Sequence, residues 1–105
     1  MAVNEPSYEV VWPLGTSHWD TRELNPRIGD LNGKTVAEIW DRVFRGEEIF
    51  PAVRAALRKR YPDVRFIEYD KFGDTHGVHQ KQVLAELPAQ FQRHKVDAVI
   101  SGVGA

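Results

Sequence analysis

The sequence predicts an α/β protein: a parallel-sheet βαβ half-domain of three layers that another polypeptide completes. A segment rich in β-branched and aromatic residues at 64–69 is followed by a helical pattern at about 78–95 and a second apolar segment at 97–101. Strand, helix and strand at this spacing form a βαβ unit, in which the two strands are parallel. The second strand runs into Gly102 and Gly104, a turn typical of the start of a helix.

The chain divides into two regions. Residues 1–34 are expected to form an extended arm and a turn-rich loop, and residues 35–105 an incomplete α/β domain that ends at the glycine turn. An apolar run at 10–14 predicts an edge strand or an arm packed on another surface. Turn-forming pairs lie at 25–26, 29–30 and 32–33, with a short strand expected near Ile28.

A helix is expected at the start of the second region. Thr-Val-Ala-Glu at 35–38 matches a capping box, in which the Thr35 hydroxyl and the Glu38 carboxylate satisfy backbone N–H groups of the first turn. Apolar residues then follow at helical spacing, so Trp40 and Phe44 are expected in the core. Gly46 would end this helix.

Two further helices are predicted. One begins at about Glu47 and tolerates Pro51 because that proline would lie in the first turn. The other spans about 78–95 and is expected to be kinked or divided at Pro88. The basic residues of the first of these two helices are interpreted as a solvated helix face, not a nucleic-acid site: Arg54, Arg58, Lys59 and Arg60.

Composition excludes several classes of protein. The chain has 105 residues, a formal net charge of −1 and no cysteine. With so small a net charge, no overall electrostatic field attracts nucleic acid or an anionic membrane. Because there is no cysteine, disulfides and thiol chemistry within the chain are ruled out. No signal sequence precedes the first turn and no apolar stretch is long enough to span a bilayer, so a cytoplasmic protein is expected.

The segment at 97–101 is expected to be buried on both faces, as in the interior of a parallel sheet. A glycine turn beyond it then requires further polypeptide, and three origins are considered: a shortened chain, a split gene, or self-cleavage before a cysteine. In the third, an N-to-S acyl shift and hydrolysis leave Ala105 as a carboxyl terminus and give a partner that begins with cysteine.

Three stretches resemble the UGSC-type proteins: LNGK at 31–34, RFIEY with FGDTHG at 65–69 and 72–77, and DAVISGVGA at 97–105. The family is named for a selenocysteine-or-cysteine, Gly, Ser, Cys motif that follows a strand and a Gly-Val-Gly turn. The resemblance covers about residues 25–105. It implies a thiol- or selenol-dependent enzyme, of redox type, whose reactive pair follows Ala105, so this chain alone should be inactive.

Candidate site residues lie in the loops of the predicted sheet edge. Asp74, His76 and His79 form a D-x-H-x-x-H cluster that suits an acid–base group, a pair of metal ligands or ordinary loop polarity. His76, with Asp74, is favoured as the catalytic group because the resemblance includes it and its loop shares an edge with residue 101. The residues expected to bind substrate are Thr75, Ser101, Gly102, Gly104, Ala105 and His18.

Two classes of function remain open. In the first, the chain is the N-terminal subunit of a cysteine- or selenocysteine-dependent enzyme. A reductase is the first choice for this enzyme, and an N-terminal-cysteine hydrolase of amides or thioesters is the second. In the second, it is a non-catalytic scaffold subunit. The expected partners are a second polypeptide in a hetero-oligomer and a small-molecule substrate. No cofactor is assigned to this chain, although a pyruvoyl group or a metal is left open.

Overall fold

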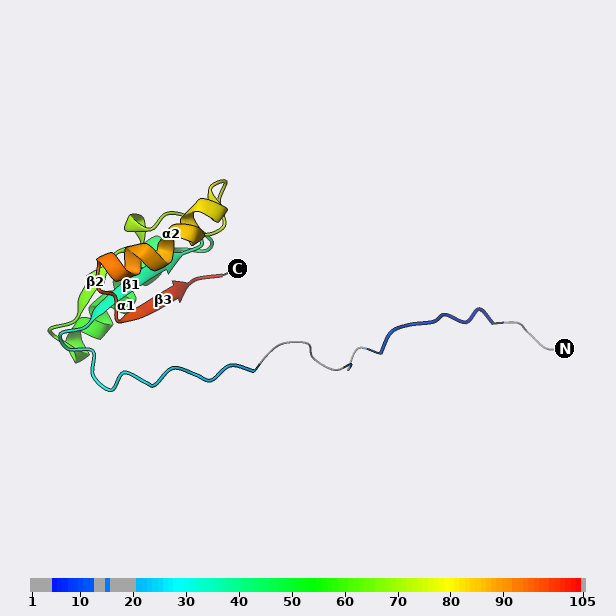
Figure 1. Ribbon diagram of the computed structural model, residues 1–105, viewed down its shortest axis with the longest axis horizontal. Coiled ribbons are helices and arrows are strands. Elements are labelled where there is room, and N and C mark those ends of the chain that lie inside the picture. The colour runs from blue at the N-terminus through cyan, green and yellow to red at the C-terminus, as the bar shows by residue number, and fades with distance from the viewer. Residues whose placement is uncertain (1–4, 13–14, 16–20, 105) are drawn as a thin grey trace.

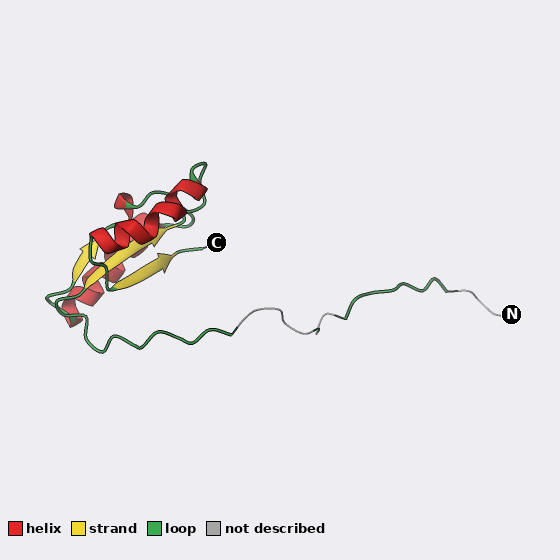
Figure 2. Ribbon diagram, in the orientation of Figure 1, coloured by secondary structure: helices red, strands yellow, loops and turns green. Residues whose placement is uncertain are grey.

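The computed structural model describes residues 5–12, 15 and 21–104. In chain order the elements are β1 (Thr35–Trp40), α1 (Gly46–Arg60), β2 (Arg65–Ile67), the 3₁₀-helix η1 (Tyr69–Lys71), α2 (Gln80–Arg93) and β3 (Ala98–Gly102). The three strands form one parallel sheet in the order β2-β1-β3, with α1 and α2 on opposite faces (Figures 1 and 2). The chain is therefore an α/β half-domain with a parallel sheet, as predicted.

β1 is the central strand, and the helix predicted from Thr35 is wrong. All six of its residues are buried, and it pairs with β2 and β3. A short segment buried on both faces has no alternation of polar and apolar residues, so its apolar spacing also fits a helix. The capping-box interpretation fails with the helix, because the backbone N–H of Thr35 donates to the Asp97 carboxylate, 2.9 Å away.

The sheet register places the two flanking strands beside different parts of β1. Thr35 lies opposite Arg65 in β2, whereas Val36 to Trp40 lie opposite Ala98 to Gly102 in β3. The crossover from β2 through α2 to β3 thus passes over β1. Both predicted strands exist, and within the described residues each lies at an edge of the sheet, so the burial of 97–101 on both faces is not observed there. Val99 of β3 is 45% exposed.

α1 covers the face of the sheet that carries the even-numbered residues of β1. Gly46 begins α1 and does not end a preceding helix, because no helix precedes it in the described part of the chain. A Cβ atom at this position would lie 2.3 Å from the indole ring of Trp40, so glycine lets the helix start against that ring. Pro51 lies in the second turn of α1, not the first.

α2 covers the opposite face, where Ala37, Ile39 and Phe72 form the buried cluster. Leu87 and Phe91 of α2 pack against this cluster. Pro88 lies inside α2 and does not divide it. Its missing N–H removes one helical hydrogen bond, and the side chains around it still hold the helix on the sheet.

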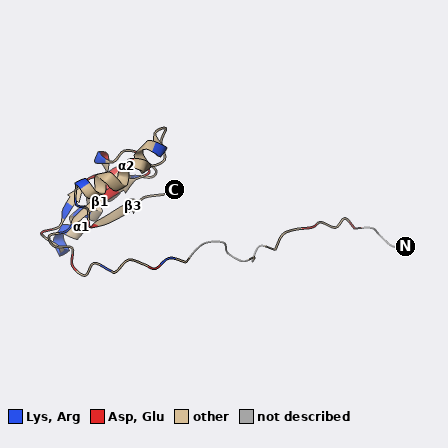
Figure 3. Cartoon of the chain, viewed as in Figure 1, with Lys and Arg blue, Asp and Glu red and all other residues tan. Residues whose placement is uncertain are grey.

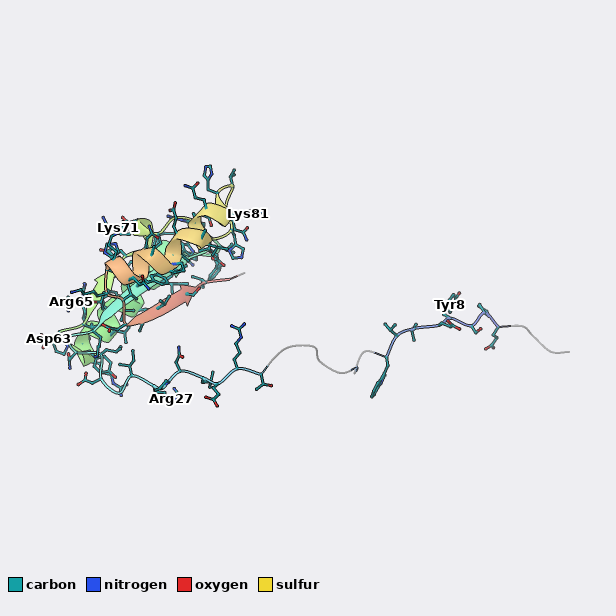
Figure 4. All side chains as sticks on the ribbon, in the orientation of Figure 1. Tyr8, Arg27, Asp63, Arg65, Lys71 and Lys81 are labelled. Atoms are coloured by element: carbon teal, nitrogen blue, oxygen red, sulfur yellow. The ribbon has the colours of Figure 1, made fainter. Side chains whose placement is uncertain are left out.

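The described parts of the first 34 residues contain no helix or strand, so the edge strand that was one alternative near residue 10 and the strand expected near Ile28 are absent there. The side chains of the apolar run are exposed, Trp12 by 73% and Val11 by 91%. Tyr8 is labelled on this extended segment in Figure 4. Leu14 lies outside the described residues.

Basic side chains of α1 gather at one end of the sheet. Arg65, at the amino end of β2, and Lys81, in the first turn of α2, mark opposite ends of the domain (Figure 4). The basic last turn of α1 gathers at the amino end, away from the carboxyl terminus (Figure 3). Of the helices in the described ranges, none is long and apolar enough to cross a membrane.

Candidate functional site

Three loops meet at the carboxyl edge of the sheet, because the carboxyl ends of parallel strands lie on the same side. Residues 41–45 follow β1, residues 68–79 follow β2, and Val103 and Gly104 follow β3. In open α/β sheets this edge is where ligands bind. The sheet thus brings together segments that are far apart in the sequence.

Asp41 fixes the turn that follows β3. Its Oδ1 accepts a hydrogen bond from the backbone N–H of Val103 at 3.1 Å, and its Oδ2 accepts one from Gly104 at 3.1 Å. Its own backbone N–H donates to the Gly102 carbonyl at 3.0 Å. Gly104 has a φ of 80°, a conformation that favours glycine. One side chain directly after the central strand therefore sets the path of the Gly-Val-Gly segment.

The negative charge of the Asp41 carboxylate is stabilised by its surroundings. Burial raises the pKa of the Asp41 carboxyl, but hydrogen bonds from three backbone N–H groups, those of Val43, Val103 and Gly104, outweigh this and lower it. Electrostatic attraction to His76 lowers that pKa as well. Asp41 is therefore a carboxylate at neutral pH, and His76 lies close enough to interact with it.

A hollow of about 390 Å³ opens between α2 and β3 at this edge. Thr75, His76 and Ser101 contribute polar groups to its wall. Its remaining lining residues are Gln80 and the apolar side chains of Ile39, Leu84, Leu87, Phe91 and Val99. An apolar floor with a few polar groups on one side is typical of a small-molecule site.

The loop before α2 orients His76. The backbone N–H of His76 donates to Oδ1 of Asp74 at 2.9 Å. Nδ1 of His76 lies 3.1 Å from the hydroxyl of Thr75, which is 7% exposed and so holds the ring from a buried position. With Nδ1 engaged by Thr75, Nε2 is the ring nitrogen that can exchange a proton with a ligand.

The structure brings some of the predicted site residues together and leaves others apart. Thr75, His76 and Ser101 line one hollow, and Gly102 leads into the turn beside it. Asp74 binds the backbone of its own loop and makes no hydrogen bond to the imidazole ring in the described structure. His79 lines a separate hollow of about 490 Å³ formed by residues 77–82. His18 and Ala105 lie outside the described residues.

The D-x-H-x-x-H cluster does not assemble as a metal site in the structure. Within residues 5–12, 15 and 21–104, no three histidine, aspartate or glutamate side chains lie close enough together to hold a metal ion. Asp74 instead closes a tight turn with the backbone of His76. The described side chains at this edge include groups that can transfer protons and form hydrogen bonds.

Glu38 and Arg54 form a buried ion pair that the sequence analysis missed. Glu38 is 1% exposed, and its two carboxylate oxygens accept from Nε and Nη2 of Arg54 at 3.0 and 2.7 Å. Nη1 of Arg54 lies 3.2 Å from Glu68. The hydrogen bond to Glu38 raises the pKa of Arg54, so the guanidinium stays charged. The solvated face assigned to Arg54 and the capping role assigned to Glu38 are both wrong.

Asp41 and Arg42 were also missed, because the region was interpreted as a helix. Phe44, which that helix would have buried, is 60% exposed. Trp40 is buried as predicted, at 8% exposure, and Arg42 lies over its ring. A signal was present in the sequence, since a polar residue directly after a buried strand marks the carboxyl edge of an α/β sheet.

Comparison with known proteins identifies the family. The UGSC family model matches residues 9–105, which includes the described part of the apolar arm as well as the three stretches that resemble the family. No curated protein and no solved structure matches the chain.

Proposed function

The chain belongs to the UGSC family, and we propose that it forms the N-terminal subunit of a thiol- or selenol-dependent enzyme of redox type. It supplies the parallel sheet, the glycine turn and the acid–base residue His76. A partner polypeptide supplies the reactive sulfur or selenium and completes the sheet in a hetero-oligomer. The proposal includes a cytoplasmic location, where thiols stay reduced.

The observation that carries the proposal is the hollow lined by Thr75, His76 and Ser101. These residues come from the loop after β2 and from the end of β3, and the fold places them beside the Gly102–Gly104 turn. The family motif begins directly after this turn. A cysteine or selenocysteine brought there would lie within reach of the imidazole.

The reactive atom comes from outside the chain, because none of its 105 residues is a cysteine. A thiol of pKa about 8.5 is mostly protonated at pH 7, and a neighbouring imidazolium lowers that value and favours the thiolate. His76 has the exposure and the free Nε2 that this role requires. Electrostatic attraction between Asp41 and His76 lowers the pKa of the Asp41 carboxyl, so a negative charge faces His76 at this edge.

In one version of the proposal, a precursor cleaves itself between Ala105 and a cysteine, which gives a partner that begins with that cysteine. The acyl group moves from the amide nitrogen to the cysteine sulfur, and water then releases a carboxylate and the free thiol. No oxidant or reductant is consumed. The exposed apolar side chains at the sheet edge favour a partner there, since Val99 is 45% and Leu84 44% exposed beside the hollow.

The test is thiol reactivity in the native assembly. The full chain is purified from its own cells with the polypeptides that accompany it, and the intact mass of each is measured. The assembly is then treated with iodoacetamide between pH 5 and 9. His76→Gln should slow alkylation at pH 7 by about tenfold, because one pKa unit changes the thiolate fraction by that factor.

His79→Gln is the matched control, because it changes a histidine of the same loop that lies outside the hollow. It should alkylate at the rate of the unaltered assembly. Absence of any thiol- or selenol-bearing polypeptide would contradict the proposal. A partner thiol whose pH profile ignores His76→Gln would support the scaffold function instead, and a first residue other than cysteine would exclude self-cleavage.

A further inference from the structure

The loop between β1 and α1 has an unusual backbone. Arg42, Phe44 and Arg45 have φ angles of 61°, 51° and 36°, in the left-handed region that side chains disfavour. Each such residue costs on the order of 1 kcal/mol or more, and strain of this kind clusters at ligand sites. The loop is held by the Trp40 indole N–H, which donates to the Val43 carbonyl at 3.0 Å.

The strained loop positions the side chain of Arg42. Its guanidinium carbon lies 4.9 Å from the centroid of the Trp40 ring and 5.4 Å from that of Tyr69. These two rings meet edge to face at 5.1 Å, and Phe50 packs behind both. A guanidinium held on aromatic faces has lost its rotational freedom in advance, so its N–H groups are ready to bind.

The donors of Arg42 have no acidic partner among the described residues. The ion pairs there use Arg45 with Glu48, and Arg54 with Glu38 and Glu68. Arg42 is exposed, and it lies over Trp40, whose register partner in β3 is Gly102. A pre-oriented cation with no acidic partner among the described residues therefore lies at the carboxyl edge of the sheet.

From this geometry we infer that Arg42 binds a carboxylate group of a small-molecule substrate at the carboxyl edge of the sheet. That this carboxylate belongs to a substrate rests on the proposed function. The carboxylate site itself rests only on the geometry of the loop. The planar fork of a guanidinium matches a carboxylate through two parallel hydrogen bonds. Phosphate sites usually combine several cations or a cradle of backbone N–H groups. Here Arg45 is already paired, and the N–H groups of the turn bind Asp41.

The indole N–H of Trp40 is a local reporter, because it donates to the loop that carries Arg42. The full chain, with any polypeptide that accompanies it, is titrated with sodium acetate and separately with inorganic phosphate at constant ionic strength. Two-dimensional NMR follows the Trp40 indole resonance. Acetate should give a saturable shift, and its apparent affinity should exceed that of phosphate.

Arg42→Gln should reduce the acetate affinity at least fivefold. Arg42→Lys keeps the charge but loses the planar fork, and it should also weaken binding. Arg45→Gln is the control, since this arginine belongs to the same loop and is already paired, and it should bind as the unaltered chain does. An unchanged amide spectrum outside the loop shows that each variant is folded.

A shift that does not saturate, or an affinity that Arg42→Gln leaves unchanged, would overturn the inference. Tighter binding of phosphate than of acetate would overturn the carboxylate assignment. His76→Gln should leave the titration unaffected, so failure of the thiol proposal and failure of the Arg42 site are distinguishable. The titration requires neither turnover nor a reactive thiol.

Discussion

The two faces of the sheet are covered in different ways. On the α1 face, β1 contributes Glu38 and Trp40, and both are buried: Glu38 pairs with Arg54 and the Trp40 ring packs against Gly46. On the α2 face, Ile39 is buried at 5% exposure, but the neighbouring β3 leaves Val99 half uncovered. One face is closed and the other is open at the carboxyl edge.

This difference separates stability from binding. On the closed face, the ion pair of Glu38 with Arg54 and the ring of Trp40 are tightly packed. This packing holds the strained loop at 41–45 in place. The open face exposes apolar side chains beside His76, and such surface in a small protein marks a site of interaction. Substitutions of the buried residues on the α1 face should therefore destabilise the chain, whereas substitutions around the hollow on the α2 face should alter ligand or partner binding.

The largest expected effect is that of Arg54→Met. It leaves the Glu38 carboxylate, 1% exposed, without its bidentate partner. Removing one member of a buried ion pair usually lowers the free energy of unfolding by about 3 to 5 kcal/mol. Urea unfolding followed by circular dichroism measures this loss.

The double variant Glu38→Leu with Arg54→Met should recover most of the lost stability, because it removes both charges. Leu84→Ala, on the open face at 44% exposure, should cost less than about 1 kcal/mol. If Leu84→Ala proves as damaging as Arg54→Met, the contrast between the two faces is wrong.

A smaller loss is expected for Gly46→Ala. The added methyl group would meet the buried Trp40 ring at 2.3 Å, and either helix or ring must shift. Forcing an extra carbon into a packed core costs about 1 to 3 kcal/mol. Gly29→Ala is the control, since nothing lies within 4 Å of its added carbon, and it should unfold at the same urea concentration as the unaltered chain.

The contrast between the faces also shows how much of the fold was readable from the sequence. α1, α2 and the two outer strands were predicted, because their patterns are long or bounded by turn residues. β1 was not. Its four letters Thr-Val-Ala-Glu fit a capping box and a buried strand equally, and only the partner of Glu38, 16 residues away, decides between them.

The site was predicted in part for the same reason. His76 and Ser101 follow predicted strands, so the rule that ligands bind at the carboxyl edge placed them together. Asp41 and Arg42 follow the strand that was misread as a helix, so the same rule was not applied to them. The Asp41 bonds to Val103 and Gly104 join residues 62 and 63 positions apart, which sequence spacing cannot show.

The smallest expected effect is a local one, the release of the glycine turn at acid pH. Because the pKa of Asp41 is lowered in the folded chain, its contribution is present above the ordinary aspartate pKa of about 3.9 and is lost as pH falls through the lowered value. The amide proton shifts of Val103 and Gly104 should titrate with a midpoint below about 3.9, followed by NMR.

Asp41→Asn keeps one acceptor oxygen but cannot titrate, so both amide shifts should become independent of pH over this range. Asp30 is the internal comparison, because its carboxylate accepts a hydrogen bond from Asn32 in an exposed turn far from the edge. A Val103 midpoint at or above the ordinary aspartate value would mean that the turn is held without the charge of Asp41. The carboxyl edge would then be fixed by the strand alone, and the open face would owe its shape to β3 and not to the residue that follows β1.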